Sequence, residues 1–303
     1  IVHHRNALLD QDAHRARRSY MRTAVICLAY MRSAAGVELL ANYLARTSAD
    51  LYVHVDAKSD PAPYVNAAAQ NPSIRLIAQR HAIFWGGFNT IRAMVAGLEA
   101  ARATADYWRF VFLTEDTIPI VSPAEFDRRM SSDAEFIETK PTSNPAIWDR
   151  YNRYFFLDSF ATTPRPCRTV EREITAEHSR ALYRMDALRS VGKVPLSDLR
   201  HGGTWWALTK RATERFLTSY WTDARLRESF EFSAISEEQY PHTVLGDLGA
   251  TAPALFADWS RTPTPFVFRT AAEIATIDSK GATFLRKVQV GEPSIQDFVL
   301  SLA

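Results

Sequence analysis

The chain has 303 residues, a formal net charge of +2 and an ordinary balance of 47% hydrophobic and 23% charged residues, which fits one large domain or two closely joined ones. The near-neutral charge gives no electrostatic case for a nucleic-acid partner, and no apolar run approaches the roughly 20 residues of a membrane span. Because the two cysteines make no disulfide framework and no secretory signal is visible, we expect a cytoplasmic protein, or one peripheral to a membrane.

The first half of the chain alternates strand and helix patterns. Residues 1–20 are polar and rich in Arg and His, and we separate them as a tail from a single domain over 21–303. Apolar runs typical of buried parallel strands lie at 23–30, 51–55, 74–77 and 110–113. Helical spacing of apolar residues covers 36–46 and 89–103. This alternation predicts an α/β fold with a mixed, mostly parallel sheet flanked by helices.

Polar turns follow two of these strands, at 56–60 and 114–116. Ligands of open α/β sheets bind beyond the carboxyl ends of the strands. The sequence therefore predicts a ligand site at this edge of the sheet.

The second half is less regular. Residues 139–168 combine four prolines with many aromatic and arginine residues, which predicts a long loop over a cleft that carries specificity. The remaining predicted elements are a charged helix over 170–190, a strand over 204–208, a helix capped by Thr209 and ending near 220, a strand over 254–259, and helices near 271–279 and 294–302.

Two adjacent carboxylates, Glu237 and Glu238, follow Ser236. Ser236 with Gln239 three residues later fits a capping box, which predicts that both glutamates lie in the first turn of a helix. A carboxylate held there at the mouth of a cleft is a natural general base. From these residues alone, stabilisation of the helix end is the favoured interpretation.

Several enzyme classes lack their motifs in this chain. There is no P-loop, no G-x-G-x-x-G after the first strand, no H-E-x-x-H or paired C-x-x-C, and no G-x-S-x-G elbow. Transfer from a sugar nucleotide remains, but the only Asp-x-Asp metal turn is in the tail, at Asp10 and Asp12. Positive side chains would then have to replace the metal. A basic cluster that could do so, or could equally be a solvated face, consists of Arg261, Arg269, Lys280, Arg286 and Lys287.

Six segments in order over about 22–290 resemble the core-2/I-branching enzyme and xylosyltransferase family, glycosyltransferase family 14, in a bacterial form. The first three segments are His54-Val55-Asp56-Ala57-Lys58-Ser59 (H-V-D-x-K-S in the family), Trp85-Gly86-Gly87-Phe88-Asn89-Thr90 (W-G-G-x-S), and 108–119, which ends in Thr114-Glu115-Asp116-Thr117-Ile118-Pro119 in place of S-G-x-D-x-P. The other three are 203–209 (G-S-Q-W-W-A-L-T), 235–245 (S-P-D-E) and Phe284-Leu285-Arg286-Lys287 (F-A-R-K).

The resemblance implies a GT-A-type fold and an inverting, metal-independent transfer of a GlcNAc- or xylose-like sugar from a UDP-sugar. It implies that Glu238 is the catalytic base. The implied donor-binding residues are His54, Val55, Asp56, Lys58, Asp116, Lys287 and Arg269, with Arg261 as the alternative to Arg269. The implied acceptor-binding residues are Trp205, Trp206, Arg150, Arg153 and Glu237, the last supporting geometry.

The same resemblance implies partners and a division of the chain. No metal or other cofactor is expected. The partners are the UDP-sugar and the hydroxyl of a glycan, lipid-linked or small-molecule acceptor. The nucleotide-binding half covers about 21–135, and the acceptor-binding and catalytic half covers about 136–303.

Other interpretations of these residues stay open. Asp56 and Lys58 could form an exposed turn pair, and Trp85 is expected to pack rather than to contact ligand. Side chains alternate along a strand, so one of Trp205 and Trp206 should be in the core, and a structural role is expected for His242. A non-catalytic, glycan- or partner-binding relative of the same fold is the alternative function. An oxidoreductase on a similar sheet would lack its glycine fingerprint.

Overall fold

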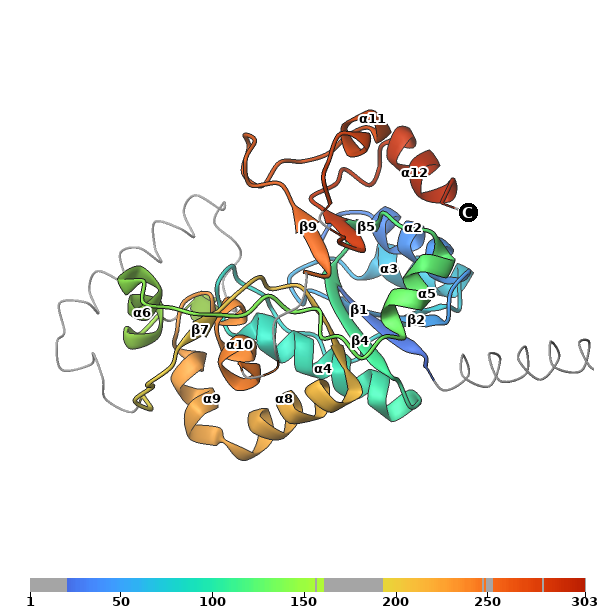
Figure 1. Cartoon of the computed structure of the whole chain (residues 1–303). Helices are drawn as coiled ribbons and strands as arrows, with labels where there is room; N and C mark the ends of the chain where they lie inside the picture. Colours follow the sequence, from blue (N-terminus) through green and yellow to red (C-terminus); the bar gives the residue numbers. More distant parts are fainter. Residues whose placement is uncertain are drawn as a thin grey trace, which may run out of the picture.

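The computed structural model describes residues 21–155, 157–160, 193–246, 248, 253–279 and 281–302 (Figure 1). The predicted tail, the predicted helix over 170–190, and Cys167 and Lys280 lie outside these residues.

A five-stranded sheet forms the centre of the molecule, in the order β3-β2-β1-β4-β8 (Figure 1). Its strands are β1 (Thr23–Ala29), β2 (Ala49–Val55), β3 (Ile74–Leu76), β4 (Arg109–Thr114) and β8 (Trp206–Thr209). The first four are parallel, and β8 is antiparallel to β4. The predicted α/β class is confirmed, as are the strands predicted at 23–30, 51–55, 74–77 and 110–113, while the strand predicted over 204–208 begins two residues later, at Trp206.

Helices cover both faces of this sheet, which explains the apolar runs. They are α2 (Ala35–Leu44), α3 (Ala62–Gln70) and α5 (Pro123–Met130) on one face, and α4 (Asn89–Thr104), α8 (Lys210–Thr222) and α10 (Tyr240–Leu245) on the other. Alternate residues of β1 enter the two resulting cores: Val25 and Cys27 pack with the first group, Ala24 and Ile26 with the second. All of β1 is buried, as expected for a central parallel strand.

A glycine sets how closely α4 approaches the sheet. A Cβ on Gly97 would come within 2.4 Å of the Ile26 Cγ2, so a larger residue would push the helix away from β1. Thr209 caps α8 by accepting the Ala212 amide, as predicted.

The C-terminal segment forms a second sheet beside the first (Figure 1). It has three strands in the order β5-β10-β9, namely β5 (Thr117–Pro119), β10 (Phe284–Arg286) and β9 (Leu255–Ala257). Two helices follow the strands of this region, α11 (Ala271–Ala275) and α12 (Pro293–Leu300). Because β10 pairs with β5 directly after β4, the end of β10 is brought to the carboxyl end of β4.

The prediction of a long loop over 139–168 is wrong for the described part. That part contains β6 (Lys140–Pro141), which pairs with β7 (Arg200–His201), then α6 (Pro145–Asn152) and the 3₁₀ helix η1 (Leu157–Phe160). The side chain of Asn144 caps α6 by accepting the Ala146 amide at 3.0 Å. Asn144 and Pro145 are therefore a helix start, with proline at the first position, where we had interpreted the proline as a loop signal.

The capping box at Ser236 is also wrong. Residues Ser236–Glu238 form a 3₁₀ turn, η3, and α10 begins only at Tyr240. The Ser236 hydroxyl is buried and donates to the carbonyls of Phe230 and Ser233. A hydroxyl that is committed as a donor to the preceding helix end, α9 (Ala224–Glu231), no longer serves as the cap of the next helix.

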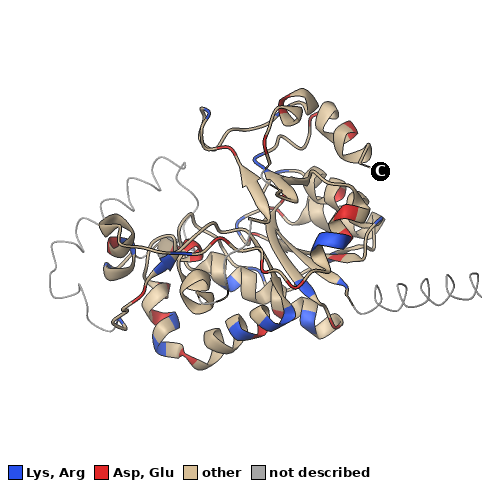
Figure 2. Cartoon of the chain, in the orientation of Figure 1, with Lys and Arg blue, Asp and Glu red and all other residues tan. Residues whose placement is uncertain are grey.

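Two C-terminal predictions were too long. The helix predicted near 271–279 ends at Ala275, before the β-branched pair Thr276 and Ile277, which disfavours continuation. The strand predicted over 254–259 stops at Ala257, so Trp259 lies beyond it. Charges of both signs are interspersed along the elements visible in Figure 2, in keeping with the net charge of +2.

Candidate active site

Polar side chains gather at the carboxyl ends of β1, β2 and β4. The parallel register pairs Ala29 with Val55 and Leu28 with Thr114, so the residues that follow each strand meet at one edge. This is the edge that the sequence predicted for a ligand site.

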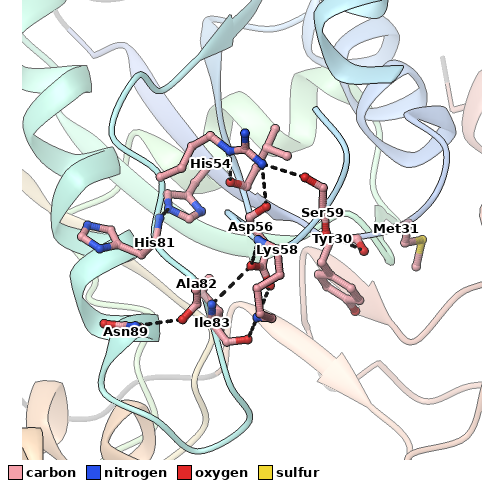
Figure 3. A network of polar contacts seen from close by, with 12 residues as sticks. Tyr30, Met31, His54, Asp56, Lys58, Ser59, His81, Ala82, Ile83 and Asn89 are labelled. Carbon is pink, nitrogen blue, oxygen red and sulfur yellow. Dashed lines mark hydrogen bonds and ion pairs between the residues drawn. The ribbon is translucent and has the colours of Figure 1, made fainter. Parts of the chain in front are cut away.

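The turn after β2 holds a buried ion pair (Figure 3). The Lys58 ammonium lies 2.6 Å from the Asp56 carboxylate, and the two side chains are only 10% and 8% exposed. Lys58 also donates to the Ile83 carbonyl, and its nitrogen lies 4.5 Å from the centre of the Phe84 ring. The alternative of an exposed turn pair is therefore wrong.

His54 and Val55 hold a neighbouring loop. The His54 Nε2 accepts the His81 amide at 2.9 Å, and the two imidazoles stack (Figure 3). Burial lowers the pKa of His54 to about 4, so the ring is neutral at physiological pH. The Arg80 guanidinium bonds the carbonyls of Val55 and Asp56 at 3.0 and 2.8 Å. The side chains of His54 and Val55 are buried and support the loop after β3.

Asp116, at the end of β4, lies between two partners. Its carboxylate accepts the Arg286 Nε at 2.9 Å and the Tyr30 hydroxyl at 3.1 Å. Burial alone would lower the pKa of Arg286, but the charge of Asp116 raises it above its usual value. The Arg286 guanidinium also lies 4.7 Å from the centre of a Trp205 ring. Sequence reasoning placed Arg286 in the basic cluster but missed this contact.

The two adjacent glutamates have different surroundings. Glu238 is 38% exposed by its side chain, and its carboxylate lies 3.2 Å from the Arg150 guanidinium. Burial raises the pKa of Glu238, against the opposing charge of Arg150. Glu237 is only 7% exposed, and burial raises its pKa to about 8. Glu237 is therefore mainly neutral at pH 7, whereas Glu238 is an accessible, ion-paired carboxylate.

The Trp-Gly-Gly turn before α4 joins the two parts of the site. The Ile235 amide, directly before η3, donates to the Gly86 carbonyl at 2.7 Å. Gly86 has a φ of 78°, a left-handed conformation that favours glycine. Trp85 is 66% exposed, so the expectation that it packs rather than contacts ligand does not fit its place on the surface. Its turn contacts η3 through Gly86 and Ile235.

Asp158 of η1 fixes this turn from behind, and sequence reasoning missed it. Its carboxylate accepts the Asn89 amide at the start of α4 at 2.9 Å. A Cβ on Gly87 would lie 2.1 Å from the other Asp158 oxygen, so the turn has room only for glycine. A single Asp in an irregular segment carries no sequence signal for such a cap.

The tryptophan pair divides as expected. Trp206 is fully buried in the core, while Trp205 is half-buried and stacks on Phe112. Of the two, only Trp205 is in a position to contact a ligand. His242 is buried with its Nε2 3.1 Å from the Gly203 carbonyl, which confirms its structural role.

Two predicted arginines lie in local pairs. Arg153 bonds Asp149 on its own helix at 2.6 Å. Arg261 bonds Asp258 at 2.5 Å and lies 3.9 Å from the centre of the Phe266 ring. Arg269 is exposed and Lys287 is half-buried beside Arg286.

A cavity of about 600 Å³ lies where β9 ends, and Arg261 is part of its wall. The remaining wall comes from residues 256–260 and 276–278. Trp259 there is 65% exposed. Ala257 is the register partner of Arg286, so the cavity begins one strand away from the Asp116 pair.

Among the residues that the structure describes, no group of three or more His, Cys, Asp or Glu is placed to hold a metal ion. Among the same residues, no helix is both long and apolar enough to cross a membrane.

The sheet and its flanking helices form a mixed, mostly parallel α/β fold, with polar side chains gathered at the carboxyl edge of its parallel strands. The chain matches the family model of the Core-2/I-Branching enzyme over residues 28–278. The protein therefore belongs to the core-2/I-branching enzyme family of glycosyltransferases, as the six motifs indicated.

Comparison with individual proteins adds little to this. The crystal structure of the apo-form glycosyltransferase GlyE from Streptococcus pneumoniae TIGR4 aligns at 11% identity, with a TM-score of 0.22, over 56% of this chain and 44% of that one. The chain thus spans less than half the length of that protein, and an overlap this weak carries no argument about the site. No curated protein matches the sequence.

Proposed function

We propose that the protein is an inverting glycosyltransferase. It moves a GlcNAc- or xylose-like sugar from a UDP-sugar to the hydroxyl of a glycan, lipid-linked or small-molecule acceptor, without a metal ion. Family membership supports glycosyl transfer in general. The observation that carries the mechanism is the accessible carboxylate of Glu238, paired with Arg150 at 3.2 Å and adjoining the turn that leads to the β2 edge.

Glu238 is the proposed general base. It takes the proton of the acceptor hydroxyl as the hydroxyl oxygen attacks the anomeric carbon and the bond to the UDP diphosphate breaks. Burial raises the pKa of Glu238, which strengthens it as a base, while Arg150 favours the ionised form that must be present before the reaction. Glu237, buried and mainly neutral, stays in place as a support for η3.

Positive side chains are proposed to stabilise the leaving diphosphate in place of a metal. Lys287 is the first candidate, because it follows Arg286 directly and so lies at the same edge as Asp116. Arg269, which is exposed, is the second. Arg261 is the third, since its charge is already balanced by Asp258.

The cavity at the end of β9 is the proposed place for part of the substrate. Its volume of about 600 Å³ is within the range of small-molecule sites, which is roughly 300–1,000 Å³. The exposed face of Trp259 offers an apolar surface for a sugar ring, and Arg261 and Asp258 offer polar contacts at its edge.

The test is Glu238→Gln, assayed by UDP release with a panel of UDP-sugars and acceptors. The variant should lose about 10²–10⁴-fold in kcat, the usual contribution of a general base, and should bind UDP as wild type does. Glu228→Gln, at an exposed position on α9, makes the same chemical change and should keep full activity. Near-wild-type turnover of Glu238→Gln would refute the assignment. A wild-type chain that binds UDP but neither transfers nor hydrolyses any donor would favour the non-catalytic alternative.

A further inference from the structure

Glu115 is a buried acid directly after β4. Its side chain is fully buried and accepts hydrogen bonds from three donors. One carboxylate oxygen accepts the amides of Tyr30 and Met31, and the other accepts the Tyr64 hydroxyl at 2.7 Å. Glu115 therefore ties the loop after β1, and α3 beyond it, to the end of β4.

Tyr30 has a hydrogen-bond partner at each of its polar groups. Its amide bonds Glu115, its carbonyl accepts the Ser59 hydroxyl at 3.2 Å, and its own hydroxyl donates to Asp116 at 3.1 Å. Tyr30 as a whole remains 42% exposed. Tyr30 thus connects the turn of the Asp56 ion pair to the Asp116 carboxylate.

Four groups face the Glu115 carboxyl: the backbone of residues 30–31, Tyr64 from α3, Cys27 from β1 and Asp116 from the turn after β4. Burial raises the pKa of Glu115 to about 7, although the bonds from Tyr30, Tyr64 and Met31 favour the ionised form. The two amides need an oxygen acceptor in either form. A glutamine can supply that oxygen and turn its NH₂ group toward the Tyr64 hydroxyl, so it should preserve the geometry.

We infer that Glu115 is a positioning residue, whose oxygens fix the backbone of Tyr30 so that the Tyr30 hydroxyl holds Asp116 in place at the donor end of the site. The inference rests on the proposed function, because the donor role of Asp116 does. Glu115 itself touches no substrate in this scheme.

Three substitutions test the inference, with kcat and donor KM measured at saturating acceptor. Glu115→Leu removes both acceptor oxygens, and Glu115→Asp keeps the charge but withdraws the oxygens by one methylene. Both should raise donor KM about tenfold, the size of one lost hydrogen bond to a charged group. Glu115→Gln should recover most of that loss. If Glu115→Leu does not fold, the comparison of Asp with Gln decides the question.

Tyr30→Phe tests the path of the effect, because it removes only the hydroxyl that reaches Asp116. It should raise donor KM by itself, and adding Glu115→Asp to it should raise donor KM far less than in the wild-type background. Tyr52→Phe is the control for stability, since it removes a hydroxyl from the buried Tyr52–Tyr107 pair, 2.8 Å apart, outside the site. It should lower the melting temperature and leave donor KM unchanged.

The outcomes separate the two proposals. Glu115→Asp with wild-type donor KM, Glu115→Gln as defective as Glu115→Leu, or additive effects with Tyr30→Phe would each overturn the positioning role while wild-type turnover stands. A wild-type chain without turnover on any UDP-sugar would overturn the proposed function, and this inference with it.

Discussion

The adjacent glutamates Glu237 and Glu238 differ in exposure because the backbone of η3 turns the Glu237 carboxyl inward and the Glu238 carboxyl outward. In the described part of the chain, one oxygen of the buried Glu237 has no hydrogen-bond partner. A carboxyl in such a place is neutral when the surroundings give no compensation. The Glu238 carboxyl, one residue later, is partly exposed and faces Arg150, so it can act as a base.

The raised pKa of the buried Glu237 predicts how the stability of the protein depends on pH. Because the folded-state pKa of Glu237 is raised from its ordinary 4.5 to about 8, the folded state holds, between these two values, a proton that the unfolded state has released. The contribution of Glu237 to the free energy of unfolding is fully present below its unfolded-state pKa. It is lost as pH rises through the folded-state pKa, at up to about 1.4 kcal/mol per pH unit.

Glu237→Gln removes this titration while keeping the size of the side chain. The free energy of unfolding, measured in urea at pH 5 and pH 8, should fall less with rising pH in this variant than in wild type. Glu115 titrates in both proteins and cancels in the comparison. An identical pH dependence in the two proteins would show that Glu237 does not carry a raised pKa.

At the scale of elements, periodicity predicted those strands and helices whose burial is regular. The alternating core contacts of β1 and the apolar residues of α4, which pack together in one of the two cores, both leave an apolar pattern in the sequence. The capping-box prediction failed because Ser236 fits the sequence pattern, but its hydroxyl donates to the Phe230 carbonyl of α9. The packing prediction for Trp85 failed because an aromatic residue on a glycine turn has no periodicity that indicates its exposure.

Two glycines of α4 and its preceding turn give a matched pair of predictions. Gly87→Ala would meet the Asp158 carboxylate at 2.1 Å and displace the turn that carries Trp85 and contacts η3. It should lower kcat/KM about tenfold, because small displacements at a site have effects of this order or larger. The measurement is steady-state kinetics on protein of verified folded fraction.

Gly97→Ala is the control for overpacking. Its Cβ would meet Ile26 at 2.4 Å in the core, so it should lose about 1–3 kcal/mol of stability. Folded Gly97→Ala should retain wild-type kcat/KM, because the contact lies within the sheet–helix interface and not at the carboxyl edge. Equal kinetic defects in the two variants would mean that the turn before α4 has no special role.

For the whole molecule, the site combines segments that are far apart in the sequence. The Arg286–Asp116 pair joins residues 170 positions apart, and Glu238 pairs with Arg150 from 88 positions away. Asp116, Arg286 and Glu238 fall in family segments, whereas Arg150 lies about 30 residues from the nearest one. The Arg286–Asp116 pair follows from the return of β10 to β5, and the Arg150–Glu238 pair from the packing of α6 near η3; no local pattern encodes either contact.

The basic C-terminal segment and metal independence give a joint prediction. Lys287→Ala should weaken UDP binding about tenfold, because a desolvated charge-assisted contact to phosphate is worth about 1.5–3 kcal/mol. Isothermal titration with UDP in metal-free buffer measures this. Lys210→Ala, at an exposed lysine paired with Asp106 at 2.8 Å, removes the same charge outside the site and should bind UDP as wild type does.

Removal of metal ions is a second test of the proposal that side-chain charges replace a metal. If side chains of this chain stabilise the diphosphate, wild-type turnover and UDP affinity should be the same in EDTA as in Mg²⁺ or Mn²⁺. A metal that carried the diphosphate would instead take most of the compensating charge, so the Lys287→Ala defect would shrink when metal is added. Strict dependence of turnover on Mn²⁺, together with unchanged UDP binding by Lys287→Ala, would contradict the metal-independent mechanism and leave the family assignment intact.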